Sequence, residues 1–295
     1  MRSLLFVPGD SEKKLEKGFS SGADVVIVDL EDSVSIENKA SARRIAADFI
    51  RARQGKDGPI LYIRVNDLST GLTDDDLAAL IPVKPAGIML PKANGGADVQ
   101  QLSVKLRVQE AENGLPDGRI AILPIITETA AGVLAAASYA GASSRLSGLT
   151  WGAEDLSAAI GARTARDERG VYTDVFRLAR TMTLLAASAA ETAAIDTVYP
   201  NFRDMDGFRR ECGEAERDGF TGKMAIHPAQ VPVINEAFTP SPEATAHAAV
   251  VIEAFRAAGN PGVVAIEGQM YDRPHLRRAE RLLARARAAG VLSSA

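Results

Sequence analysis

Short apolar runs alternate with longer amphipathic stretches along most of this chain. Eight runs are almost continuously apolar, which is typical of strands buried on both faces of a parallel sheet. We expect strands at Leu4–Val7, Val25–Leu30, Ile60–Val65, Gly87–Leu90, Ile120–Ile126, Leu146–Trp151, Ala194–Tyr199 and Lys223–Ile226. Helical patterns lie between them, most clearly at Ser11–Ser20, Glu37–Arg53, Asp98–Asn113 and Asp174–Glu191. Because open sheets of this kind usually stop at about five to seven strands, eight βα units predict an α/β fold, a closed (β/α)8 TIM barrel.

The segment after the eighth strand is longer than a barrel requires. Val231–Phe238 fits the last barrel helix, and Thr239-Pro240-Ser241-Pro242 breaks the helical pattern. Beyond the break we expect a helix at Glu243–Ala258, a short strand at Val263–Glu267 and a basic helix at His275–Ala289. The chain therefore divides into a catalytic barrel, 1–238, and a C-terminal helical extension, 239–295. The extension is either a simple packing element or a lid over a barrel mouth.

Composition and charge exclude several classes of protein. The net charge of −4 argues against nucleic acid as a partner, because nucleic-acid binding needs a basic surface. No stretch approaches the roughly 20 apolar residues that cross a bilayer, so we expect no membrane partner. Cys212 is the only cysteine, which rules out a disulfide within the chain and fits a cytoplasmic location. The sequence also lacks a P-loop, a Gly-rich Rossmann turn and a nucleophile elbow.

Polar residues stand at the end of nearly every expected strand. They are Pro8-Gly9-Asp10, Asp29 with Glu31 and Asp32, Arg64 with Asn66, Lys92, Thr127-Glu128-Thr129, Gly152-Ala153-Glu154-Asp155 and His227-Pro228. In a TIM barrel the catalytic groups come from this end of the strands. Charged residues beside buried strands are costly unless they are paired or bound to a metal. The pattern therefore predicts an active site at the C-terminal mouth of the barrel.

Glu128 and Asp155 follow neighbouring strands and could approach each other closely. Two close carboxylates repel unless a cation lies between them. Oxygen ligands of this kind suit Mg2+, or Mn2+ in its place. The alternative is that each residue caps the helical stretch that it opens. Zinc does not fit, because the chain has only three histidines and one cysteine.

Arg64 closes the third expected strand. Its planar fork suits the carboxylate of an oxoacid or the oxygen of an enolate. The alternative is a structural ion pair with a nearby acid such as Glu31.

Asp29, Glu31 and Asp32 form an acid cluster whose mutual repulsion requires nearby cations. The candidate cations are Lys39, Arg43, Arg64 and Lys92. We expect the cluster, together with Lys39 and Lys92, to hold Arg64 and metal-bound waters in place rather than to react. Lys92 could also form a Schiff base, although a role as charge partner is simpler.

Further candidate residues are Lys13, Lys14 and His227, each with two alternative roles, and Asp272 in the extension. Lys13 and Lys14 follow the first strand and are either solvated or in contact with phosphates. His227, which precedes Pro228, is either a general base or a residue that orders its loop and touches the ligand. Asp272, taken alone, reads as the N-cap of the last helix.

Taken together, these segments resemble the HpcH/HpaI aldolase and citrate lyase beta-subunit-like family of CoA ester lyases. The matching segments are RSLLFVPGD (2–10), DVVIVDLEDSV (24–34), YIRVN (62–66), GIMLPK (87–92), ILPIITETAAGV (122–133), LTWGAEDLSA (149–158) and GFTGKMAIHPAQV (219–231). The tail GQMYDRPHLRRAERLL (268–283) resembles the lid of the malyl-CoA and citramalyl-CoA lyases. The family usually has an aliphatic residue where Tyr271 stands.

The resemblance implies specific roles for the candidate residues. Glu128 and Asp155 would hold Mg2+, Arg64 would be the catalytic arginine, and Asp272 would be a lid aspartate acting on an adjacent subunit. Gly152, Ala153 and Glu154 would line the substrate site with Arg64, Glu128 and Asp155. Lys13, Lys14, His227 and Pro228 would contact coenzyme A, and the segment 223–231 would help to hold it. Trimers, or hexamers built from trimers, are the expected assemblies.

The reaction implied by the resemblance is magnesium-dependent and breaks or forms a carbon–carbon bond. A short 3-hydroxyacyl-CoA such as malyl-, citramalyl- or citryl-CoA would give an acyl-CoA and a 2-oxoacid. One alternative is a metal-dependent aldolase that acts on free oxoacids. Another is the beta subunit of a multi-subunit citrate lyase, which would need an acyl-carrier partner.

Overall fold

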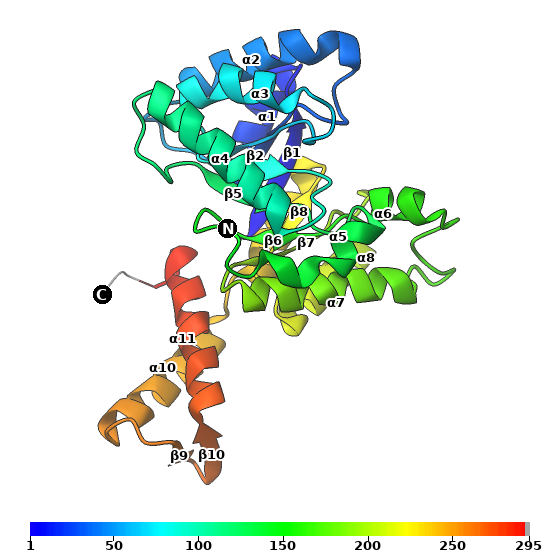
Figure 1. The fold of residues 1–295 in the computed structure, drawn as a ribbon. Coiled ribbons are helices and arrows are strands. Elements are labelled where there is room, and N and C mark those ends of the chain that lie inside the picture. Colours follow the sequence, from blue (N-terminus) through cyan, green and yellow to red (C-terminus); the bar gives the residue numbers. More distant parts are fainter. Residues whose placement is uncertain (293–295) are drawn as a thin grey trace.

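Eight parallel strands close into a barrel in the computed structural model, which describes residues 1–292 (Figure 1). The strands are β1 (Ser3–Pro8), β2 (Val25–Asp29), β3 (Ile60–Arg64), β4 (Gly87–Leu90), β5 (Ala121–Pro124), β6 (Leu149–Thr150), β7 (Ala194–Asp196) and β8 (Gly222–Ala225). Their order in the sheet is β5-β4-β3-β2-β1-β8-β7-β6. Two isolated parallel bridges, Ile122–Leu146 and Ile125–Thr150, join β5 to β6. The predicted barrel is therefore confirmed.

Helices follow the strands and cover the outside of the barrel. They are α1 (Glu12–Phe19), α2 (Lys39–Arg51), α3 (Thr73–Leu80), α4 (Gly96–Glu112), α5 (Ala130–Leu134), α6 (Ala153–Ile160), α7 (Asp174–Ala189), α8 (Met205–Asp218) and α9 (Val231–Phe238). Short 3-10 helices lie at Ile36–Asn38, Ile81–Val83, Ala136–Tyr139 and Pro228–Gln230. The sixth strand is much shorter than the apolar run 146–151 indicated, because only two of its residues pair with β7.

Side chains alternate between two apolar layers along each strand. In β2, Val25 and Ile27 belong to the cluster that fills the barrel interior, whereas Val26 and Val28 pack under the surrounding helices. All five β2 residues are buried. Burial on both faces explains why the strands read as continuous apolar runs rather than as alternating ones.

The register of the first three strands places their polar ends side by side. Pro8 pairs with Asp29, and Asp29 pairs with Arg64. Just beyond β1, the backbone N–H of Gly9 donates to the Asp29 carbonyl at 2.8 Å. A Cβ at position 9 would lie only 2.9 Å from that carbonyl oxygen, so the approach requires glycine. The chain thus brings the acid of β2 beside the guanidinium of β3.

The C-terminal extension is a helical hairpin with its own small core. It consists of α10 (Pro242–Ala257), β9 (Val263–Ile266), β10 (Gln269–Asp272) and α11 (Arg273–Ala288). Its apolar core includes Val251, Phe255 and Leu283, in a cluster separate from those of the barrel. Figure 1 shows this extension projecting from the barrel, with the β9–β10 hairpin at its far end. The sequence analysis did not anticipate β10, whose residues are half-buried or exposed and give no apolar run.

One contact ties α11 back to the barrel: Arg285 donates to Glu216 of α8 at 3.0 Å and to the Phe238 carbonyl at 3.3 Å. Among the described residues, no helix has both the length and the apolar character needed to cross a bilayer.

Candidate active site

Arg64 and Asp29 form a bidentate ion pair at the mouth of the barrel. The Arg64 Nε and Nη2 atoms donate to the two Asp29 carboxylate oxygens at 2.7 and 2.6 Å. The Arg64 Nη1 atom lies 2.8 Å from Glu31 Oε2, although this contact is not aligned as a hydrogen bond. A guanidinium has five N–H donors, and the two bonds to Asp29 leave three of them, one of which faces Glu31, to meet a ligand. The structural ion pair and a catalytic role are therefore compatible.

Burial and charged partners shift the pKa values of the groups in this cluster. Burial alone would raise the pKa of Asp29, but the hydrogen bonds and charge of Arg64 outweigh it and hold that pKa below its usual value. Burial raises the pKa of Glu31, and Arg64 and Lys92 offset only part of that effect. The pKa of Arg64 is raised because its carboxylate partners overcome the cost of burial. Arg64 is thus a permanent, fixed cation.

Lys92 connects the acid cluster to the predicted metal pair. Its Nζ atom forms an ion pair with Glu31 and lies 3.4 Å from Asp32 and 3.7 Å from Asp155. Its backbone N–H donates to the Glu128 carboxylate. Burial lowers the pKa of Lys92, but the surrounding carboxylates raise it further, which keeps the amine charged. A charged, ion-paired amine is a poor nucleophile, so the charge-partner reading fits better than a Schiff base.

Glu128 and Asp155 converge on Lys92 from neighbouring strands. Glu128 is buried, with 3% of its surface exposed, whereas the Asp155 side chain keeps 34%. The cap alternative fails for Glu128, because Thr129 caps α5 by accepting from the Gly132 N–H. The N-cap of α6 is Gly152, and no side chain makes a cap hydrogen bond there. Glu128 is therefore not committed to a helix end, whereas Asp155 lies in the first turn of α6, where its charge complements the helix dipole.

The chemistry of this pair fits a magnesium ion. Burial raises the pKa of Glu128 to about 8, and the nearby charges of Asp155 and Glu31 add to the effect. A cation between the two carboxylates would relieve this penalty. Within residues 1–292 no group of three or more His, Cys, Asp or Glu side chains could hold a metal. Two protein carboxylates leave room for waters and substrate oxygens, as Mg2+ prefers, and do not suit a structural zinc site.

The start of α6 lies against the Glu128 side chain. A Cβ at Gly152 would lie 2.8 Å from Glu128 Cγ, so only glycine allows this approach. Ala153 is buried and Glu154 is exposed. The structure thus places Gly152 beside the predicted metal ligand, and it places Glu154 on the surface.

Lys39 and Arg43 form no ion pair with the acid cluster. The Lys39 Nζ atom donates to the backbone carbonyls of Leu30 and Glu31 at 2.7 and 2.8 Å, which holds the loop after β2, although its charge still interacts with the nearby acids. Arg43 instead pairs with the fully buried Asp76 at 2.6 Å. Of the four candidates, Arg64 and Lys92 are therefore the cations that pair directly with the cluster.

The predicted coenzyme A residues occupy two separate elements. Lys13 and Lys14 are exposed on α1. His227 caps the 3-10 helix that begins at Pro228, since its Nδ1 accepts from the Ala229 N–H at 3.1 Å. The His227 ring also stacks on Phe202, with ring centroids 4.9 Å apart. His227 therefore orders its loop, and sequence reasoning missed Phe202.

Lys223 cannot contact coenzyme A, contrary to the expectation for the segment 223–231. It is completely buried and pairs with Asp196 at 2.7 Å and with Glu211 at 2.8 Å. Strand alternation explains the difference, because Lys223 points outward into the helical layer while Met224 fills the barrel interior.

Asp272 lies in the extension and caps α11. Its side chain accepts from the His275 N–H, and its Oδ1 atom lies 2.5 Å from the His275 Nδ1 atom. The contact with His275 lowers the pKa of Asp272. In Figure 1 the β9–β10 hairpin that leads into this residue points away from the barrel of the same chain. The structure does not bring Asp272 together with Arg64 and Glu128 within one chain.

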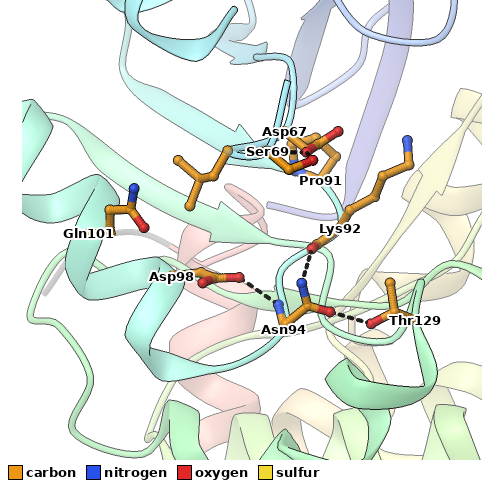
Figure 2. Close-up of a pocket in the computed structure, with 9 residues that line it drawn as sticks. Asp67, Ser69, Pro91, Lys92, Asn94, Asp98, Gln101 and Thr129 are labelled. Carbon is orange, nitrogen blue, oxygen red and sulfur yellow. Dashed lines mark hydrogen bonds between the residues drawn. The ribbon is translucent and has the colours of Figure 1, made fainter. Parts of the chain in front are cut away.

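An open pocket of about 380 Å³ is lined in part by Lys92 and by Thr129, the residue after Glu128 (Figure 2). It is lined by Asp67, Leu68, Ser69, Pro91, Lys92, Asn94, Asp98, Gln101 and Thr129. Of these residues the sequence analysis named Lys92 and Thr129, although Asp67 and Asn94 also closely follow the ends of β3 and β4.

A TIM barrel with a paired guanidinium, a charged lysine and acidic side chains at its C-terminal mouth has the architecture of a barrel enzyme. The sequence profile of the HpcH/HpaI aldolase/citrate lyase family matches residues 2–228. The chain belongs to that family, which confirms the resemblance and the expectation of a lyase-type enzyme.

Relatives of known name support this assignment over almost the full chain. The chain is 35% identical to the (3S)-malyl-CoA thioesterase of Cereibacter sphaeroides, covering 97% of this chain and 95% of that protein. It is 34% identical to the mitochondrial citramalyl-CoA lyase of Rattus norvegicus, covering 96% and 85%. A crystal structure of CitE from Mycobacterium tuberculosis with magnesium, acetoacetate and coenzyme A matches with a TM-score of 0.76, 36% identity and 97% of each chain.

Proposed function

We propose that this protein is a magnesium-dependent carbon–carbon lyase. Its substrate would be a short 3-hydroxyacyl-CoA such as malyl-, citramalyl- or citryl-CoA, and its products an acyl-CoA and a 2-oxoacid. The observation that carries the proposal is the convergence of Glu128 and Asp155 on Lys92, beside the Arg64–Asp29 pair. The CitE structure with magnesium and coenzyme A, and the names of the malyl-CoA and citramalyl-CoA relatives, support it.

Glu128 and Asp155 would hold Mg2+, with Mn2+ as a substitute, and Gly152, Ala153 and Glu154 would border the substrate. When bound, the metal supplies Lewis-acid polarisation of the substrate's oxygens. The remaining N–H groups of Arg64 would meet the oxygen on which charge develops. Asp29 and Glu31 would hold that guanidinium in its orientation, while the charge of Lys92 would offset the repulsion among the nearby carboxylates.

Cleavage would begin at the carbinol hydroxyl, which gives its proton to a neighbouring carboxylate or water and becomes the carbonyl of the oxoacid, while the bond to the carbon beside the thioester breaks. The electron pair of that bond becomes the enolate of the acyl-CoA. A carboxylic acid then protonates the enolate carbon, and we assign this step to Asp272. Closure of the lid would exclude water from the acid.

Asp272 would act in the barrel of a neighbouring subunit. The extension projects from its own barrel, which supports this assignment. We therefore propose a homo-oligomer, a trimer or a hexamer built from two trimers, with residues 1–238 as the catalytic barrel and 239–295 as the lid. Lys13, Lys14, His227 and Pro228 would bind the coenzyme A portion. A cytoplasmic location is proposed because the single cysteine, Cys212, is buried and unpaired.

Turnover of thioesters by the purified chain tests the proposal. Malyl-CoA and citramalyl-CoA should be cleaved in Mg2+, with acyl-CoA and oxoacid appearing in equal amounts, and excess chelator should stop the reaction. Activity on free hydroxy acids alone would select the free-oxoacid aldolase instead. A requirement for an acyl-carrier protein would select the citrate lyase beta subunit.

A further inference from the structure

Six side chains form a closed ring of contacts beneath α6, the helix that carries Asp155. We call it the Trp151 ring, and its members are Trp151, Asp196, Lys223, Glu211, Arg166 and Tyr172. They come from β6, β7, β8, α8 and the loop between α6 and α7. None of them belongs to the candidate site, and four of the six carry a charge.

The polar half of the ring is deeply buried. The Trp151 Nε1–H donates to Asp196 Oδ1 at 2.8 Å, and Lys223 donates to Asp196 Oδ2 at 2.7 Å. Lys223 also donates to Glu211 Oε1 at 2.8 Å. Trp151, Asp196 and Lys223 have no exposed surface. The Lys223 charge therefore depends on its two ring partners, while Asp196 also accepts from Arg180 Nε, outside the ring, at 3.2 Å.

The other half closes the ring through the loop after α6. Arg166 Nη2 lies 2.7 Å from Glu211 Oε2, an ion-pair contact that is not aligned as a hydrogen bond. The Arg166 guanidinium stacks 3.7 Å from the Tyr172 ring centre. The Tyr172 ring packs edge-on against Trp151, with ring centroids 5.0 Å apart. A backbone bridge also joins residues 166 and 172.

The ring clamps α6 at both of its ends. Trp151 immediately precedes Gly152, the N-cap of α6, and Arg166 and Tyr172 hold the loop that follows the helix. Residues 152–165 therefore form a short segment whose two ends are both attached to the Trp151 ring. Asp155 lies in the first helical turn of that segment. Loosening of the ring is expected to move Asp155 relative to Glu128, whose carboxylate accepts from the Lys92 backbone N–H.

We infer that the Trp151 ring is a positioning device that holds Asp155 in place for metal binding. The inference rests on the proposed function, because it assigns a metal to Glu128 and Asp155. Buried ion pairs add little net stability over an apolar core of similar shape, but they fix orientation. Groups that support metal ligands in this way typically change metal affinity or activity about 10- to 100-fold when they are altered.

The link between Arg166 and Glu211 is the best place to open the ring. Arg166 keeps 23% of its side chain exposed, and its loss leaves Asp196, Lys223 and Glu211 paired with one another. Arg169 provides a matched control in the same loop, because its side chain is 83% exposed and pairs only with Asp167. Arg166→Gln and Arg169→Gln therefore remove the same charge with different effects on the ring.

The test is a Mg2+ titration of the metal-stripped full-length protein by calorimetry. Arg166→Gln should weaken Mg2+ binding about 10- to 100-fold, Arg166→Lys by less, and Arg169→Gln not at all. Trp151 is the only tryptophan, so its emission reports the ring directly. The emission should shift in Arg166→Gln and stay unchanged in Arg169→Gln. Far-UV circular dichroism should match the wild type in every variant.

Equal Mg2+ affinity in Arg166→Gln and the wild type would overturn the inference and leave the proposed function standing. A wild-type protein that binds no Mg2+ would overturn both. If Arg166→Gln does not fold, Tyr172→Leu opens the ring at an uncharged link and carries the same expectation. Tyr172→Phe is then the matched control, since it keeps the aromatic face against Arg166 and Trp151.

Discussion

The backbone N–H of Lys92 donates to the Glu128 carboxylate from a left-handed conformation, with φ of 50°. A residue other than glycine rarely adopts this conformation, and here it lets one residue serve two groups. Its N–H points to Glu128 while its side chain reaches Glu31. The loop after β4 thereby links the predicted metal pair to the acid cluster that holds Arg64.

Neutralising either predicted metal ligand should abolish metal-dependent turnover. Glu128→Gln and Asp155→Asn keep the size of each side chain but remove the charge that Mg2+ requires. We expect no measurable Mg2+ binding by calorimetry and loss of activity in both variants. Glu214→Gln is the control, because that side chain is exposed on α8 and lies outside the candidate site. Full activity of either ligand variant would refute the metal site.

The stability of the metal-free protein should fall as the pH rises toward 8. Burial raises the pKa of Glu128 from 4.5 to about 8, so the folded state binds this proton more tightly than the unfolded state does. The resulting stability is fully present below pH about 4.5 and is lost as the pH rises through about 8. Urea unfolding with chelator across this range should show the decline. It should be weaker in Glu128→Gln, and Mg2+ should reverse it.

Replacing Arg64 by lysine should reduce kcat roughly 100- to 1,000-fold, the range seen when one oxyanion donor is lost. A lysine keeps the charge, but it cannot donate to both Asp29 oxygens and also reach Glu31 and the substrate. Steady-state kinetics on the CoA thioester would measure the loss. Arg43→Lys is the control, since Arg43 pairs with Asp76 away from the acid cluster. Near-normal kcat in Arg64→Lys would count against the assignment.

The substitution Gly152→Ala, which adds one methyl group, should impair Mg2+ binding. Its Cβ would lie 2.8 Å from Glu128 Cγ, so the carboxylate must shift. Gly213→Ala is the control, because no atom lies within 4 Å of its added Cβ inside α8. That variant should keep its Mg2+ affinity and gain about 0.5–1 kcal/mol of stability from helix propensity. Identical Mg2+ affinity in the two variants would show that the close approach has no effect.

Asp272 can be tested by mixing inactive subunits. Asp272→Asn and Arg64→Lys should each have little activity alone, while mixed oligomers should regain some of it. This recovery requires that Asp272 of one chain serves the barrel of another. Proton exchange at the acetyl methyl of acetyl-CoA should also stop in Asp272→Asn. Exchange at the wild-type rate would exclude Asp272 as the acid.

Much of the fold follows from local sequence. Each strand is read from a continuous apolar run, and residues such as Asp29 and Glu128 are found because they end such runs. The break at Thr239-Pro240-Ser241-Pro242 likewise separates α9 from α10 as expected. Strand β10 was missed because its residues form no apolar run. Lys223 was assigned wrongly because the sequence pattern does not show which face of the strand its side chain occupies.

The sequence alone determined that the polar groups lie at one end of a barrel, because strand period and chain order are local properties. Only the tertiary structure decided which of those groups meet. Lys92 faces Glu31 and Asp155, Lys39 holds carbonyls instead, and Trp151 joins a ring drawn from three strands, a helix and a loop. Which charges pair depends on the distance between segments that are far apart in the sequence, and on how deeply each group is buried. Neither quantity can be read from the residues next to a side chain in the sequence.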